Sequence, residues 1–198
     1  MPRLGDIAVL RAGATLRGRD GTRPDPEGEY RFIRIGDIGS GGEISPDSVI
    51  RIQPNTPVPK AHWLRPGDVL VPARGQRTAA AAFRLDCEKA IVGPQFFVAR
   101  PKAGILPEYL AWFLRSECAC KHFDLRRKGT YVQLLQRGDV ADLEVPLPPL
   151  RVQELIVALD ALIREEARLS ARLTGLRAQL GQGRLLCRAQ RHQAPVTQ

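Results

Sequence analysis

The sequence predicts an α+β protein, with a mixed α/β domain over residues 1–145 followed by one long, coiled-coil-forming α-helix over residues 146–181. Two observations predict this division. Up to about residue 145, short apolar runs are separated by glycine and proline, as is typical of strands and turns. After Pro146-Leu-Pro-Pro149, leucine recurs every three or four residues, as is typical of a helix. Residues 182–198 contain Gly183, Pro195 and several glutamines, and we expect a flexible tail there.

The N-terminal domain is predicted to contain short strands and one clear helix. Residues 30–35 alternate apolar and basic side chains, which predicts a half-exposed strand. Further strands are predicted over residues 69–71, 79–85 and 90–99, the last interrupted at Gly93-Pro94. Residues 107–116 predict a helix, because proline stands at the first position and the apolar residues share one face. Residues 124–138 are expected to form a charged loop region.

The long helix carries a heptad seam, in which apolar residues recur in steps of four and three. The seam consists of Leu155, Leu159, Leu162, Glu166, Leu169, Leu173, Leu176 and Leu180. A strict 3.5-residue repeat keeps a seam facing a partner helix, whereas the stripe of a helix packed on its own domain would drift. About thirty helical residues form a rod of roughly 45 Å, too long for a domain of this size to cover. We therefore expect a partner helix, with packing on the chain's own domain as the alternative.

The seam is symmetric about its centre, which permits an antiparallel homodimer. Reversing one copy matches Leu155 with Leu180, Leu159 with Leu176 and Leu162 with Leu173, and sets Glu166 opposite Leu169. The two Glu166 side chains then avoid facing each other. A lone polar seam residue can help to fix the register, and basic residues flank this one: Arg164, Arg168, Arg172 and Arg177. Any strict heptad seam has some such pairing, so antiparallel order is a hypothesis.

The charge of the chain favours a nucleic-acid partner. The formal net charge is +9, the sequence pI is near 10, and 25 of the 30 basic residues are arginine. Residues 1–140 hold 22 basic and 15 acidic residues, so most of the excess lies in the N-terminal domain. The planar fork of arginine suits phosphate oxygens and guanine edges. A GC-rich coding sequence is the alternative cause of a high arginine content.

Three arginine-rich clusters fall in predicted loops, and each contains glycine, which lets the backbone approach a phosphate. Their threonine, glutamine and tyrosine side chains can bond to bases or to the DNA backbone. The candidate DNA contacts are Arg17, Arg19, Arg23, Arg74, Gln76, Arg77, Arg126, Arg127, Lys128, Thr130, Tyr131 and Gln133. A solvated loop is the alternative for any one cluster, but three loops with a local charge excess favour a binding surface.

No catalytic residue, metal site or cofactor site is predicted. Asp68 with Asp86, Glu88 and Lys89 faintly resembles a metal-dependent nuclease, but Glu88 and Lys89 are adjacent and would point to opposite faces of a strand. The three histidines have no matching serine or cysteine, and no glycine-rich segment is followed by the Gly-Lys-Thr/Ser of a phosphate loop. No Asn-Pro-Pro-Tyr methylation motif is present, so the chain is not expected to be a methyltransferase itself.

The cysteines and the N-terminus indicate an intracellular protein. Cys118-Ala-Cys120 lacks the spacing of common zinc ribbons, and the four scattered cysteines are typical of reduced thiols. The first residues contain no long apolar run, so no signal peptide is predicted, and no segment is apolar enough to span a bilayer. We expect a cytoplasmic location and no membrane partner.

Several short motifs, taken in their order along the chain, resemble the specificity (S) subunits of type I restriction–modification systems. The motifs are Leu4-Gly-Asp-Ile7, Phe32-Ile-Arg-Ile-Gly-Asp-Ile38, Leu64-Arg-Pro-Gly-Asp-Val-Leu70, Pro107-Glu-Tyr-Leu110, Gly129-Thr-Tyr-Val-Gln133 and Val145-Pro-Leu-Pro-Pro-Leu-Arg-Val-Gln-Glu-Leu-Ile156. The resemblance extends from about residue 1 to residue 180, and the last motif is its most specific part. Val152 stands where the family commonly has an acidic residue, which bears on docking of the methylase more than on the fold.

The resemblance implies a non-catalytic subunit that recognises DNA. Members of the family usually carry two target recognition domains, each followed by a long helix, and the helices pair antiparallel. One domain and one helix imply a half-length form that dimerises to read a bipartite, inverted-repeat target in double-stranded DNA. The implied partners are adenine methyltransferase subunits, which bind S-adenosylmethionine, and restriction or motor subunits. Two alternatives are a DNA-independent assembly adaptor of such a complex and a stand-alone metal-dependent nuclease.

Overall fold

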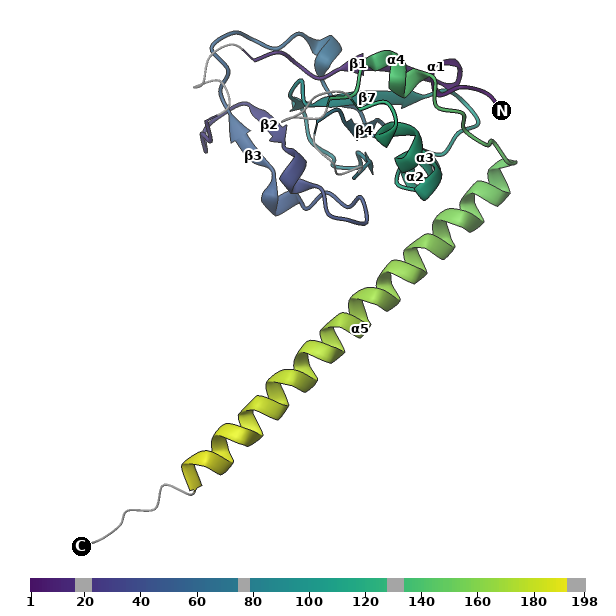
Figure 1. The fold of residues 1–198 in the computed structure, drawn as a ribbon. Coiled ribbons are helices and arrows are strands. Elements are labelled where there is room, and N and C mark those ends of the chain that lie inside the picture. The colour runs from purple at the N-terminus through teal and green to yellow at the C-terminus, as the bar shows by residue number, and fades with distance from the viewer. Residues whose placement is uncertain (17–22, 75–78, 128–133, 192–198) are drawn as a thin grey trace, which may run out of the picture. The chain divides into compact units, whose positions relative to one another are not determined.

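The computed structural model of the protein confirms the α+β fold class, with two small sheets, short helices and one long C-terminal helix (Figure 1). The structure describes residues 1–16, 23–74, 79–127 and 134–191, and the side chains as far as residue 189. The chain divides into two compact units, 1–157 and 158–198, which are described separately. The second unit contains the greater part of the long helix.

Two sheets form the first unit. The larger has the order β1 (Ala8–Ala12), β7 (Phe96–Pro101), β4 (Val69–Pro72) and β5 (Ala81–Ala82), with every neighbouring pair antiparallel. The smaller has the order β3 (Ile50–Ile52), β2 (Tyr30–Ile33) and β6 (Ala90–Val92), in which only β2 and β6 are parallel. The strands predicted over 69–71 and 90–99 are confirmed, including the break at Gly93-Pro94. The strand predicted over 30–35 is present but ends at Ile33, and it is mostly buried where a half-exposed strand was expected, because both faces of the smaller sheet are covered. The strand predicted over 79–85 is reduced to two residues.

The helices of the first unit are short. They are α1 (Leu4–Ile7), α2 (Pro107–Leu114), α3 (Glu117–Asp124) and α4 (Arg137–Ala141), with single 3-10 turns at Ile35–Asp37, Pro46–Ser48 and Lys60–His62. Helix α2 confirms the predicted helix, with proline in its first turn. Helix α4 lies inside the region expected to be loop. Only Val140 of α4 is buried, so its five residues carry too little apolar periodicity to be predicted.

The core of the first unit has three layers of apolar contact. Helices α1 to α4 pack on one face of the larger sheet, where Val69 and Phe97 belong to the same cluster as Leu110 and Phe123. The opposite face of that sheet packs on the smaller sheet through residues that include Leu70, Val98, Ile33 and Val92. The outer face of the smaller sheet is covered through the Val58 and Trp63 segment, which packs on Tyr30, Phe32, Ile52 and Ile91.

One local turn occurs four times and explains why Gly-Asp-Ile/Val recurs in the sequence. The four copies are Leu4-Gly-Asp-Ile7, Ile35-Gly-Asp-Ile38, Pro66-Gly-Asp-Val69 and Arg137-Gly-Asp-Val140. In each, the aspartate carboxylate accepts the backbone N–H three residues earlier, at 2.8–3.2 Å. This bond satisfies a donor at the start of the turn, and the following isoleucine or valine is buried. The repeated motif is therefore a structural device that directs the chain back into the core.

The long helix α5 (Leu150–Arg191) has 42 residues and differs from the prediction at both ends. It begins at Leu150 because Pro148 and Pro149 cannot lie inside a helix. It continues beyond residue 181, since two glycines cost only about 1 kcal/mol each among strong helix formers. The expected flexible tail is therefore corrected for residues 182–191, and residues 192–198 lie outside the described part. Within that part, none of the helices is both long and apolar enough to cross a membrane.

The seam leucines of α5 are exposed. Leu155, Leu159, Leu162, Leu169, Leu173, Leu176 and Leu180 expose 49–68% of their surface, and Glu166 is exposed as well. A row of leucines in contact with water, interrupted in this seam by Glu166, is unfavourable, because burying each leucine contributes roughly 1.5–3 kcal/mol. The helix therefore presents an apolar face that a partner helix can cover.

Candidate nucleic-acid interface

The three arginine-rich loops begin or end at one edge of the larger sheet. Strands β1 and β4 both run antiparallel to β7, so they run parallel to each other and end at the same edge. The first loop follows β1 and the second follows β4. The third loop returns to this edge, because Arg74 and Leu134 form an antiparallel bridge. The sheet topology thus gathers loops that are far apart in the sequence.

Backbone hydrogen bonds join the stems of these loops through the turn between β6 and β7. Gly13 donates to the Phe96 carbonyl at 2.9 Å, and Ala73 donates to the Gln95 carbonyl at 2.8 Å. Leu135 then donates to the Ala73 carbonyl at 2.9 Å. We call the surface formed by residues 13–16, 73–74, 92–96 and 134–135 the loop edge. These bonds fix the stems from which the three arginine-rich segments extend.

Gly13 is required for this close arrangement. A Cβ atom at this position would overlap the backbone of Gly93, so no larger residue fits without moving the β6–β7 turn. The glycine therefore allows the first stem to lie directly against that turn.

The structure describes four of the twelve candidate DNA contacts. Arg23 and Arg74 are exposed, and Arg74 stands on the loop edge itself. Eight candidates lie outside the described residues, namely Arg17, Arg19, Gln76, Arg77, Lys128, Thr130, Tyr131 and Gln133. One stem of each cluster is nevertheless placed on the loop edge, whereas the other stem of the first cluster, at Arg23 and Pro24, pairs with Ile52 of the smaller sheet.

Arg126 and Arg127 lie at the end of α3, where the third loop begins. Arg126 is half-buried, and its Nη1 atom donates to the His122 carbonyl at 3.3 Å. The side chain of Arg127 is only 2% exposed and donates to Asp124 Oδ1 at 3.1 Å. Its guanidinium group is thus enclosed by protein in the described structure. We assign Arg127 as an anchor of the loop stem, and the DNA contact expected of it from the sequence stays a prediction.

A cavity beside the first stem adds polar groups that the sequence did not single out. It has a volume of about 420 Å³ and is lined by residues that include Thr15, Asn55, Thr56 and His62. Hydroxyl, amide and imidazole groups are common donors to the DNA backbone and to base edges. No sequence signal marked this segment, because it joins the first stem only through tertiary contacts.

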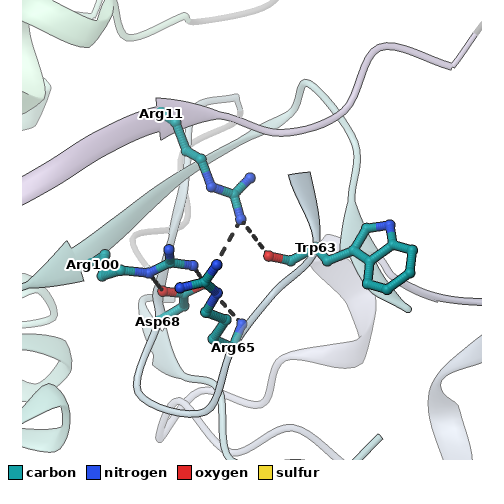
Figure 2. A network of polar contacts seen from close by, with 5 residues as sticks. All are labelled: Arg11, Trp63, Arg65, Asp68 and Arg100. Carbon is teal, nitrogen blue, oxygen red and sulfur yellow. Dashed lines mark hydrogen bonds and ion pairs between the residues drawn. The ribbon is translucent and has the colours of Figure 1, made fainter. Parts of the chain in front are cut away.

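Asp68, the strongest acidic candidate for nuclease chemistry, is bonded inside the protein (Figure 2). Its side chain is 1% exposed, and Arg100 binds both carboxylate oxygens at 2.7 and 2.8 Å. Arg11 lies 3.7 Å from Asp68 Oδ2 and donates to the Trp63 carbonyl at 3.2 Å. This network joins β1, β7 and the turn before β4, and Asp68 serves as its centre.

The surroundings of Arg11 and Arg100 shift the pKa values of the two side chains in opposite directions. Burial lowers the pKa of Arg11, and the nearby Arg100 and Arg65 lower it further, while Asp68 opposes the change. The hydrogen bond to Asp68 raises the pKa of Arg100.

Among the described residues, no three His, Cys, Asp or Glu side chains are placed to hold one metal ion.

Comparisons with known proteins find solved structures with a similar fold, but no family model and no curated protein with a similar sequence. No family model matches the chain. No curated protein matches it either. Solved structures do match, and the chain covers less than half of the length of each of the three described next.

The first match is a chain from a structure of complex assembly and conformational transition in the type I R-M system. It has a TM-score of 0.67 and 23% identity, over 91% of this chain and 42% of that one. The HsdS subunit from Thermoanaerobacter tengcongensis has a TM-score of 0.58 and 23% identity, over 83% and 37% of the two chains. The type I restriction–modification S subunit from M. genitalium has a TM-score of 0.53 and 15% identity, over 90% and 42%. The resemblance noted in the sequence is therefore confirmed in three dimensions: this chain has the fold of type I restriction–modification specificity subunits.

Proposed function

We propose that the protein is a DNA-recognition subunit of a type I restriction–modification-like system. The observation that carries the proposal is that one stem of each of three arginine-rich segments lies on the loop edge of the larger sheet. The likeness to S subunits over most of the chain supports the same role. We call the first unit, residues 1–157, the head. Arginine side chains on the loops bind phosphates and position the head on the duplex, and polar groups beside them read base edges.

The exposed seam supports a dimer with two heads. Two copies pair antiparallel through α5, and the paired helices act as a spacer between the heads. Because identical heads read identical half-sites, the target is a bipartite inverted repeat. The dimer holds adenine methyltransferase subunits on this target, and those subunits bind S-adenosylmethionine. Restriction or motor subunits join the same complex.

Selection from a random pool of DNA duplexes tests this role. The full chain, alone and with an adenine methyltransferase subunit of a type I system, is expected to enrich two inverted half-sites at a fixed spacing. Replacing Arg23 and Arg74 with glutamine is expected to weaken binding to all sequences. It is also expected to reduce the slope of log K against log salt by about 1 for each phosphate that the variant no longer binds.

Arg3→Gln is the matched control. Arg3 is an exposed arginine directly before α1, and α1 leads into the opposite end of β1 from the loop edge. This variant is expected to bind DNA as the unmodified chain does. Equal binding by the Arg23/Arg74 double variant, with its salt slope unchanged, would refute a DNA surface formed by the loop edge together with the first arginine-rich segment.

Two other functions predict different outcomes. A DNA-independent assembly adaptor would join the methyltransferase without enriching any sequence. A stand-alone nuclease would cut plasmid DNA when the pure protein is incubated with Mg²⁺, and replacing an acidic side chain would abolish that cutting. The enclosure of Asp68 by arginines favours DNA recognition over the nuclease.

A further inference from the structure

Charged side chains next to the seam distinguish between the possible ways of pairing two copies of α5. One residue stands immediately before every second seam position: Ala158, Glu165, Arg172 and Gln179. We call these four residues the flank. In an antiparallel pair the flanks of the two helices face each other, because reversing one helix brings the same side of each seam together. Opposite charges at such positions stabilise a pairing and like charges oppose it.

The leucine-matched register, with Leu155 opposite Leu180, brings opposite charges together. In this register Glu165 faces Arg172 of the second copy, and the two-fold axis repeats the contact on the other side. Ala158 faces Gln179, so the flank contains no like-charge contact. In the same register Arg172 of one copy lies beside Glu166 of the other copy, and Glu166 is the single charged residue of the seam.

Shifting one helix by a heptad in either direction removes this match. In one direction Glu165 faces Glu165 of the second copy. In the other direction Arg172 faces itself, and Leu159 and Leu155 lie opposite Gly183 and Cys187. Each shifted antiparallel register therefore combines a like-charge contact with fewer paired leucines.

A parallel pair is also disfavoured by charge. The two Glu166 side chains would meet in the seam, and Arg172 would approach Arg177 of the second copy. Burying two carboxylates together is costly, because neither is neutralised. Of these pairings, only the leucine-matched antiparallel register brings Glu165 to Arg172 and avoids a like-charge contact beside the seam.

We propose that Glu165 and Arg172 form a reciprocal clamp that sets the direction and register of an α5 homodimer. The clamp rests on the proposed dimer and adds the residues that align it. Both side chains are on the exposed face available to a partner, and Glu165 is 50% exposed. Within one helix Glu165 already bonds to Arg168 at 2.6 Å, but a solvent-exposed pair of this kind is weak and does not prevent a second partner.

Charge exchange in the full chain tests the clamp, with dimer dissociation measured by sedimentation. Glu165→Arg and Arg172→Glu each convert two attractive contacts into two repulsive ones, and each is expected to weaken the homodimer roughly tenfold or more. The double variant restores opposite charges and is expected to return to within about threefold of the unmodified chain. Mixing the two single variants is expected to produce a heterodimer that is tighter than either homodimer.

Arg164→Glu is the matched control, because it makes the same charge change on the helix face opposite the seam. It is expected to leave dimerisation within about twofold of the unmodified chain. Circular dichroism shows whether each variant keeps its helix.

The outcomes separate the clamp from the proposed dimer. A stronger dimer for Arg172→Glu would indicate a parallel pair, because that substitution attracts Arg177. A dimer that none of the exchanges affects would overturn the clamp and leave the dimer standing. An unmodified chain that stays monomeric at micromolar concentration, with and without DNA, would overturn both.

Discussion

The side-chain oxygen of Gln153 accepts the backbone N–H of Leu106 at 3.0 Å, which ties the first turn of α5 to the start of α2. The side-chain nitrogen of Gln153 donates to the carbonyls of Gly104 and Pro148, at 3.1 and 2.9 Å. The side chain is almost fully buried, so each of its bonds replaces water. A buried glutamine in the first turn of a long, exposed helix therefore fastens that turn to the head.

Replacing Gln153 with leucine is expected to destabilise the first unit. The substitution leaves three backbone groups without their partner, at roughly 1–3 kcal/mol for each group that stays buried. We expect a fall of about 5–10 °C in the melting temperature, measured by calorimetry. Gln182→Leu makes the same change at an exposed position of α5 and serves as the control. Equal melting of the two variants would show that the Gln153 bonds contribute nothing.

Asp68→Asn is expected to destabilise the head more strongly than removal of a surface ion pair. The substitution leaves Arg11 and Arg100 near each other without a carboxylate, and breaking a buried pair costs about 3–5 kcal/mol. The lower end is expected because the Arg100 side chain is 36% exposed. Asp142→Asn, which removes an exposed partner of Arg3, should cost no more than about 1 kcal/mol. Urea unfolding measures both, and similar midpoints would contradict the role of Asp68 as the centre of the network.

Glu166→Leu is expected to strengthen the proposed dimer and weaken its preference for one direction. The change completes two leucine layers, each worth about 1 kcal/mol or more. It also removes the charge that disfavours a parallel pair. Sedimentation measures the affinity, and disulfide trapping measures the direction. Leu159→Cys chains should crosslink to Leu176→Cys chains when the pair is antiparallel, and to themselves when it is parallel. A weaker dimer for Glu166→Leu would show that Glu166 makes a favourable contact across the seam.

Cys87 is expected to react slowly with thiol reagents at neutral pH. Burial raises the pKa of the Cys87 thiol above its ordinary value, Arg31 opposes the rise, and Asp86 adds to it. A raised pKa means less thiolate at pH 7, so the labelling rate should climb at a more alkaline pH than that of an ordinary exposed thiol. Cys118 and Cys187 are exposed and should be labelled first. Mass spectrometry of labelled peptides follows each site, and labelling of Cys87 ahead of both would refute the expectation.

The elements with strong local patterns were predicted from the sequence. The 3.5-residue spacing of leucine predicted α5, and the alternation in residues 30–35 predicted β2. Proline and apolar spacing predicted α2. Helix α4 was missed because five residues with one buried side chain leave no periodic signal. The extension of α5 past Gly181 was missed because glycine was given more weight than the helix formers around it.

The sequence by itself determined the long helix, its seam and the clustering of arginine on loops, because these features depend on residues close together in the chain. Only the tertiary structure decided where the loop stems meet, that Arg127 is enclosed, and that Asp68 and Gln153 are structural. The physical reason is that these properties come from contacts between distant segments, such as Ala73 with Leu135 and Gln153 with Leu106. Local periodicity carries no information about such partners, since strand pairing and burial choose them during folding.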